Sequence, residues 1–363
     1  LNLSGGIERV LTTKANYLAD VLGYEVHIIT ARQKGRKEFF PLSERIIRHD
    51  LDANDRMFLF KYRKRLDTLL GKIRPDFTVT VCDNSLYALT RCTDGSVKVG
   101  EFHFSHEKFL MKYGNNVFGR MYASLRTRRL ENAVRKLDRF VVLTMADKED
   151  WEKVRPDVEQ IYNPLSFVSQ DVSPLTAKRC MAAGRLEGQK NFKDLITAWQ
   201  TVSARHPDWT LSIYGNGSQR DALQSQINSA GLQGKVILEG NTNNVRKEML
   251  DSSCLVMSSR FEGFPMILLE ALTTGLPIVS YDCPKGPSEV VTIGANGYLA
   301  KVGDTATLAQ GICSVIANED LRRRFGAESK RRSENFTLEK TMERWDRLFS
   351  SLTTSRTRTS PEG

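Results

Sequence analysis

The stretch from Cys254 to Pro277 constrains the fold most strongly, because it joins a strand to a helix through a polar loop. Residues 254–257 are a short apolar run, which predicts a buried strand. Pro265 suits the first position of a helix, where its fixed φ is favourable and its missing N–H costs nothing. Gly275 and Pro277 then end that helix. This order is the repeating unit of parallel α/β proteins, in which ligands bind at the carboxyl ends of the strands.

Two glutamates lie in this stretch, Glu262 on the loop and Glu270 in the helix. The helix is apolar nearly all round, so the Glu270 carboxylate is expected to be buried and must find hydrogen bonds or a cation. It is either a buried ion pair or cap acceptor, or an acceptor for a ligand diol such as a ribose. Glu262 is either a solvated loop acid or part of the same ligand site. The N–H groups near Gly263 and Phe264 are expected to point toward that ligand.

The spacing from Glu262 to Glu270 resembles the E-x7-E motif of the retaining glycosyltransferases of family 4, also called the glycosyl transferases group 1 family. Further segments resemble motifs of this family in the expected order, namely residues 184–186 with 190–192, residues 213–217 and residues 294–299. The match covers nearly the whole chain and is densest between residues 180 and 300. The resemblance implies the GT-B fold, in which two Rossmann-like domains with parallel sheets face each other across the cleft that holds the active site.

The length of 363 residues suits two domains. The predicted strands are residues 26–30, 77–81, 97–100, 140–143, 179–183, 211–214, 236–238, 254–257 and 278–280. By the resemblance, residues 1–165 form an acceptor-binding domain and residues 166–337 a nucleotide-sugar-binding domain, while an amphipathic helix at about residues 338–352 crosses back onto the first domain. The polar tail, residues 353–363, is expected to be disordered. Because the chain begins at a glycine loop, the first strand is expected to be missing from a truncated sequence.

Arg185 and Lys190 follow a predicted strand and are either surface cations or a pair that neutralises a diphosphate. The resemblance favours the diphosphate, since departure of the leaving group builds negative charge that preorganised cations stabilise. It also implies that Gly6, otherwise a plain turn residue, faces the same diphosphate together with Gly263 and Phe264. Glu270 would bind the ribose. Glu262 would lie at the donor sugar, where it stabilises positive charge, orients the hydroxyls or acts as nucleophile.

Many members of the family place a histidine near the donor sugar at the end of the strand predicted at residues 97–100. His103 is the chosen catalytic candidate and His106 its competitor, because spacing does not separate them, and a lone histidine is more often structural. Asn241 and Thr242, on the loop after residues 236–238, are expected beside the nucleotide base.

No metal or other cofactor is expected. The six cysteines are scattered without metal-ligand spacing and are interpreted as reduced core residues. Asp50-Leu51-Asp52 matches the D-x-D pattern of metal-dependent transferases, but it lies outside the expected strand-end context and is interpreted as chance.

The resemblance implies a retaining hexosyltransferase that moves a hexose or N-acetylhexosamine from a nucleotide sugar, preferably UDP-linked with GDP left open, to a glycan or lipid-linked saccharide acceptor in bacterial surface polysaccharide assembly. The alternatives are an epimerase or hydrolase of the same fold and a non-catalytic polyanion or nucleic-acid binder. The formal net charge of +10 suggests nucleic acid, but no recognition motif is present and aromatic residues are not interleaved with the basic runs.

No apolar run approaches the length of a membrane span, and no signal peptide is visible. The scattered reduced cysteines favour a cytoplasmic protein. Basic residues cluster at residues 61–65 and 120–136. They are either a solvated helix face or a means of peripheral attachment to the anionic inner face of a membrane.

Overall fold

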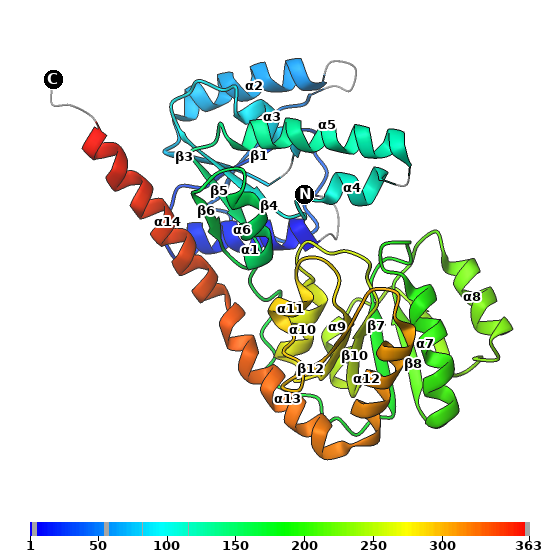
Figure 1. Cartoon of the computed structure of the whole chain (residues 1–363). Helices are drawn as coiled ribbons and strands as arrows, with labels where there is room; N and C mark the ends of the chain where they lie inside the picture. Colours follow the sequence, from blue (N-terminus) through cyan, green and yellow to red (C-terminus); the bar gives the residue numbers. More distant parts are fainter. Residues whose placement is uncertain (2–5, 54–57, 82, 115, 360–363) are drawn as a thin grey trace. The chain divides into compact units, whose positions relative to one another are not determined.

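The computed structural model (Figure 1) divides the chain into two α/β units. The first contains Leu1–Pro164 together with the chain from Leu338 onward, and the second contains Leu165–Thr337. The structure describes residues 1–359 apart from residues 2–5, 54–57, 82 and 115.

The first unit holds two parallel sheets. One pairs β1 (His27–Thr30) with β2 (Ile47–Asp50). The other contains, in spatial order, β3 (Phe77–Thr80), β4 (Val97–Phe102), β5 (Arg139–Val142) and β6 (Val158–Gln160). The helices of this unit before Pro164 are α1 (Gly6–Asp20), α2 (Phe58–Ile73), α3 (Asp83–Leu89), α4 (Lys108–Tyr113), α5 (Val117–Val134) and α6 (Met145–Glu152). A cavity of about 480 Å³ is lined by residues of α1, β1 and β3 and by α14 (Leu338–Thr359).

The central strands of the larger sheet, β4 and β5, are buried on both faces. Successive strand side chains point to opposite faces, and β5 is apolar on both. Phe140 and Val142 pack with the core that includes residues of α5 and α6, whereas Val141 packs with Trp345 and Phe349 of α14. Burial on both faces explains why β5 is a continuous apolar run rather than an alternating one.

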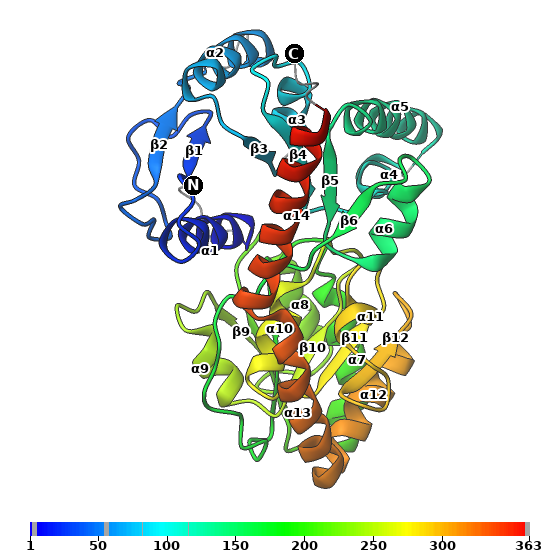
Figure 2. The same cartoon turned by 90° about the vertical axis from the view of Figure 1, so that its left-hand side faces the viewer.

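The C-terminal helix α14 packs against the first unit, where Figure 2 shows it lying across the strands. Its apolar face, which includes Met342, Trp345 and Leu352, is buried. The prediction of an amphipathic helix is therefore confirmed. The predicted disorder of residues 353–363 is wrong for residues 353–359, which continue α14, because no glycine or proline interrupts the chain before Pro361. The last four residues lie outside the described part.

The second unit contains one parallel sheet in the order β12-β11-β10-β7-β8-β9. Its strands are β7 (Arg179–Ala183), β8 (Thr210–Tyr214), β9 (Val236–Gly240), β10 (Cys254–Met257), β11 (Ile278–Tyr281) and β12 (Gly297–Ala300). Its helices are α7 (Phe192–Arg205), α8 (Arg220–Ser229), α9 (Val245–Leu250), α10 (Met266–Thr273), α11 (Pro287–Val290), α12 (Thr305–Ala317) and α13 (Glu319–Ser333). The chain order reverses between β7 and β10, and such a reversal is where open α/β sheets bind ligands.

The parallel α/β class predicted for both halves is confirmed. Three details differ. Pro265 is the N-cap of α10 rather than its first residue, because its ψ of 94° is extended. The strand predicted at residues 97–100 continues to Phe102. The strands β2, β6 and β12 were not predicted, since β2 is largely exposed and polar, β6 has only three residues and most of β12 lies in residues 294–299, which were interpreted as a family motif.

Candidate functional site

The turns after β7 and β8 pack backbone against backbone. Gly184 and Gly215 have φ values of 153° and 136°, which other residues rarely adopt. A Cβ on Gly215 would lie 1.9 Å from the Gly184 carbonyl oxygen, so no larger residue fits there. The Gly184 N–H donates to the Tyr214 carbonyl at 2.9 Å. Gly184 and Gly215, which belong to two of the predicted motifs, thus allow the turns after β7 and β8 to pack closely at the carboxyl edge of the sheet.

A partly buried ion pair joins the loops after β7 and β10. The Lys190 Nζ lies 2.7 Å from the Glu262 Oε1, and both side chains are largely shielded from solvent. The Ser258 hydroxyl donates to the Lys190 carbonyl at 2.9 Å, and the Gln189 side-chain amide donates to the Phe261 carbonyl at 3.0 Å. These bonds fix the two loops side by side at the reversal of strand order. Sequence reasoning selected Lys190 and Glu262 separately but did not pair them, and it missed the two polar residues that tie the loops.

The Glu262 carboxylate determines the electrostatics of this part of the second unit. A buried carboxylate is costly unless a cation and hydrogen bonds accompany it, and Lys190 supplies the cation. Burial, together with the nearby Glu262 charge, raises the pKa of the Cys283 thiol, so this cysteine stays neutral. Arg185 lies exposed on the turn after β7, at the same sheet edge as Lys190.

The predicted burial of Glu270 in α10 is confirmed. The Ser166 hydroxyl donates to its Oε1 at 2.5 Å, a partner that sequence reasoning did not identify. The start of α10 is tightly packed, because a Cβ on Gly286 would lie 2.4 Å from the Pro265 Cδ. Gly263 is half-buried, and Phe264 is buried with its ring 6.1 Å from that of Phe336.

The loop predicted beside the base follows β9 at the same carboxyl edge. Asn241 is exposed, and the Thr242 hydroxyl accepts the Asn244 N–H at 3.0 Å. Asn244 in turn caps α9. Because β8 separates β9 from β7, this loop lies farther out along the edge than Lys190.

In the first unit, His103 follows β4 directly and is buried. Its Nε2 lies 3.2 Å from Oε1 of Glu101, whose carboxylate also binds the buried Lys14 of α1. Burial raises the pKa of Glu101, but the charges of Lys14 and His103 outweigh it and hold the pKa at about 2. Neither Lys14 nor Glu101 was assigned a role from the sequence. The sequence did hold a signal that Lys14 is buried, because Lys14 shares a helix face with the apolar Val10, which is buried.

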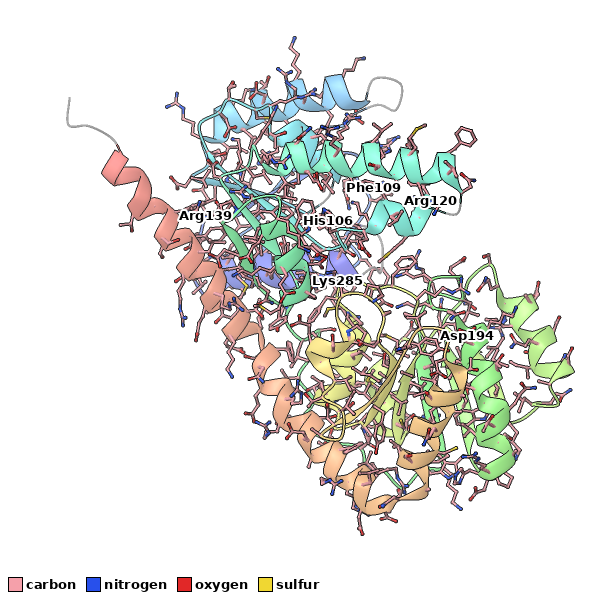
Figure 3. All side chains as sticks on the ribbon, in the orientation of Figure 1. His106, Phe109, Arg120, Arg139, Asp194 and Lys285 are labelled. Atoms are coloured by element: carbon pink, nitrogen blue, oxygen red, sulfur yellow. The ribbon has the colours of Figure 1, made fainter. Side chains whose placement is uncertain are left out.

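His106, the competing candidate, lies in the turn before α4 and is labelled in Figure 3. Its Nε2 lies 3.1 Å from the Glu131 Oε1, and its ring stands edge-on to Trp151 at 4.7 Å between centroids. Gly6 is the exposed first residue of α1, and the residues just before it lie outside the described part.

Asp50 ends β2, and its carboxylate accepts the backbone N–H groups of Lys34 at 2.8 Å and Asp52 at 3.3 Å. The Asp50 carboxylate therefore stabilises the local turns of the backbone.

The five cysteines within the described residues are free thiols, four of them buried, whereas Cys82 lies outside that part. A search of the described helices finds none with the length and apolar character that a bilayer crossing needs.

Two family models match the chain. The model of glycosyltransferase family 4 matches residues 4–166, and the model of glycosyl transferases group 1 matches residues 169–332. An uncharacterized glycosyltransferase of Haemophilus influenzae is 28% identical over 348 residues, which make up 94% of this chain and 95% of that relative.

Two solved structures share the fold. The lipopolysaccharide outer core galactosyltransferase WaaB, in its apo form, matches with a TM-score of 0.78 and 20% identity over 97% of each chain. A variant of S. aureus TarM, in complex with fondaparinux, alpha-GlcNAc-glycerol and UDP, matches with a TM-score of 0.67 and 23% identity, over 79% of this chain and 58% of TarM. These likenesses confirm the predicted GT-B fold. With one family model on each unit, the chain belongs to the glycosyltransferases of family 4, the glycosyl transferases group 1 family.

Proposed function

We propose that this chain transfers a hexosyl or N-acetylhexosaminyl group from a UDP-linked sugar to a glycan or lipid-linked saccharide, with retention of the anomeric configuration, in bacterial surface polysaccharide assembly. The observation that carries the proposal is the Lys190–Glu262 pair, held at 2.7 Å where the strand order reverses. The names of WaaB and TarM's bound UDP support the polysaccharide context and the choice of nucleotide.

Lys190 and Arg185 are the proposed partners of the donor's diphosphate. Cleavage of the bond between the anomeric carbon and the diphosphate oxygen leaves negative charge on the leaving group. Cations that are already in place stabilise this charge without a metal ion. A diphosphate would compete with Glu262 for Lys190, so donor binding loosens the ion pair and leaves the carboxylate to the sugar.

Glu262 is the proposed catalytic residue on the donor side. As the leaving group departs, the sugar ring acquires positive charge, and a carboxylate in a shielded site stabilises it or forms a bond to it. Glu270, beside the Ser166 hydroxyl, is the proposed ribose acceptor. Gly263 and Phe264 offer backbone donors to the diphosphate, and Asn241 with Thr242 contacts the base.

In the first unit, Gly6 and His103 are the proposed donor-binding residues, for the diphosphate and the sugar respectively. His103 is preferred to His106 because it directly follows β4, whereas His106 lies in the turn before α4 beside Glu131 and Trp151.

Peripheral attachment to an anionic membrane is the proposed means of reaching a lipid-linked acceptor. The chain carries a formal net charge of +10, and Lys61, Arg63 and Lys64 on α2 and Arg120, Arg128 and Arg129 on α5 are exposed. Each cation near such a surface contributes roughly 1 kcal/mol. Arg126, by contrast, is bonded to the Tyr122 hydroxyl at 3.1 Å and lies over the Phe109 ring, so it is a weaker contributor.

A panel of labelled nucleotide sugars, offered with and without a lipid-linked saccharide, tests the proposed function. We expect label in the acceptor from a UDP-sugar, with Glu262→Gln inactive under the same conditions. Release of an isomerised or free sugar at the full rate without acceptor would instead identify an epimerase or hydrolase. Binding of polyanions with no turnover of any donor would exclude an enzyme.

A further inference from the structure

The outer face of α5 carries large apolar side chains that are open to solvent. Val117 is 71% exposed, Phe118 79%, Met121 60% and Leu125 62%. Tyr122 is exposed beside them. Figure 1 shows α5 beside α4, and Leu110 of α4 is exposed as well.

These residues form one continuous stripe. Positions 117, 118, 121, 122 and 125 recur at helical spacing, so they share one face of α5. The opposite face is also apolar, and there Ala123, Leu130 and Val134 pack into the core of the first unit. The inner face therefore accounts for the folding of α5, and the outer stripe is not needed for it. Contiguous exposed apolar surface of this kind marks an interaction site, whereas scattered single residues do not.

The charges around the stripe identify the kind of partner. Arg120, Arg128 and Arg129 are exposed on the same helix, and Figure 3 shows Arg120 on this segment. The one acidic residue of α5, Glu131, is occupied by His106. An apolar stripe flanked by arginines is the composition of helices that lie in the headgroup region of anionic bilayers.

We propose that the outer stripe of α5, defined as Val117, Phe118, Met121, Tyr122 and Leu125, inserts into the boundary between headgroups and acyl chains of an anionic membrane, with the arginines contacting lipid phosphates. This rests on the membrane attachment put forward under the proposed function, but not on glycosyl transfer. Insertion of the stripe changes how membrane binding is expected to depend on salt concentration. Attachment by charge alone disappears at high ionic strength, whereas an inserted apolar stripe retains part of its binding.

Sedimentation of the whole chain with vesicles tests the proposal. The vesicles are either a mixture of phosphatidylglycerol and phosphatidylcholine or pure phosphatidylcholine. The stripe variant carries Phe118→Ser, Met121→Ser and Leu125→Ser. The matched control carries Val168→Ser, Ile293→Ser and Val302→Ser, which replace three exposed apolar residues of the second unit. We expect the stripe variant to lose about tenfold or more in partition to anionic vesicles, and the control to match the unmodified chain.

Insertion has its own optical readout. Phe118→Trp should gain blue-shifted emission on anionic vesicles and be quenched by brominated acyl chains, whereas Ile293→Trp should do neither. Equal vesicle binding by the stripe variant, or Phe118→Trp emission that vesicles leave unchanged, would overturn the proposal. So would a dimer of the unmodified chain that the stripe variant dissociates without any vesicle binding, because the stripe would then join two copies. Donor turnover is measured in parallel: its absence from every variant, beside normal vesicle binding, would defeat the proposed function and leave this inference standing.

Discussion

At the scale of single residues, the burial of Glu262 and the position of Lys190 depend on the ion pair between them. The carboxylate is buried because a lysine accompanies it, and the lysine is held because two loops are bonded together around it. The sequence indicated both residues by motif, but their pairing depends on the spatial adjacency of β7 and β10, which are separated by two strands in the chain.

Glu262→Gln should lower kcat by about two orders of magnitude or more, a loss of roughly 3 kcal/mol of transition-state stabilisation. The fold should persist, since the amide keeps the size of the side chain. UDP affinity should be equal or higher, because Lys190 no longer has a competing carboxylate. Initial rates and calorimetric titration with UDP measure both effects, with the exposed Glu319→Gln as control. Normal turnover by a folded Glu262→Gln protein would remove this residue from the chemistry.

Arg185→Ala and Lys190→Ala should each weaken binding of UDP but not of uridine, because only UDP carries a diphosphate. Charge-assisted contacts of this kind contribute about 1.5–3 kcal/mol each. Lys190→Ala should also lower the thermal midpoint, since it leaves Glu262 buried without its cation. The exposed Lys193→Ala serves as control. Parallel losses for UDP and uridine would argue against a diphosphate role.

At the scale of elements, α1 is tied to β4 by the Lys14–Glu101 pair. Glu101→Gln leaves Lys14 buried without its anion and should cost about 3–5 kcal/mol of unfolding free energy. The combined change Lys14→Met with Glu101→Leu should restore most of it, as apolar replacements of whole buried pairs often do. Chemical denaturation measures all three proteins. Equal stability of Glu101→Gln and the unmodified chain would show that the pair is not buried in solution.

The same pair predicts a pH dependence. The pKa of Glu101 is about 2 in the folded chain, below its ordinary value of 4.5. A depressed pKa means that the ionised carboxylate stabilises the fold above pH 4.5, and that this contribution is lost as the pH falls toward 2. The stability advantage of the unmodified chain over Glu101→Gln should therefore shrink across that window. A constant difference between the two proteins would contradict the assignment.

The elements also show what sequence patterns capture. The buried strands β7 and β10 were predicted at their observed bounds, because short apolar runs between helices leave little choice. The partly exposed β2 and the short β6 lack that pattern. Ser166, Lys14 and Glu101 were missed for a different reason, since partnerships across 87 or 104 residues leave no periodic trace in the chain.

At the scale of the whole molecule, Lys190 and Arg185 are proposed to stabilise the diphosphate in place of a metal ion. Asp50 is already engaged by backbone N–H groups. Transfer should therefore continue in EDTA at a rate close to that without it. Loss of activity in chelator, with recovery on adding Mg²⁺ or Mn²⁺, would reassign the diphosphate to a metal and reopen the Asp50-Leu51-Asp52 segment.

Retaining transfer with Glu262 at the donor sugar is proposed for this member of the family. It is tested by proton NMR of the first product, formed from an α-linked UDP-sugar before mutarotation. We predict an α-configured anomeric proton on the product of the unmodified chain and no product from Glu262→Gln. A β-configured product, or an α-configured product formed equally fast by Glu262→Gln, would contradict the account.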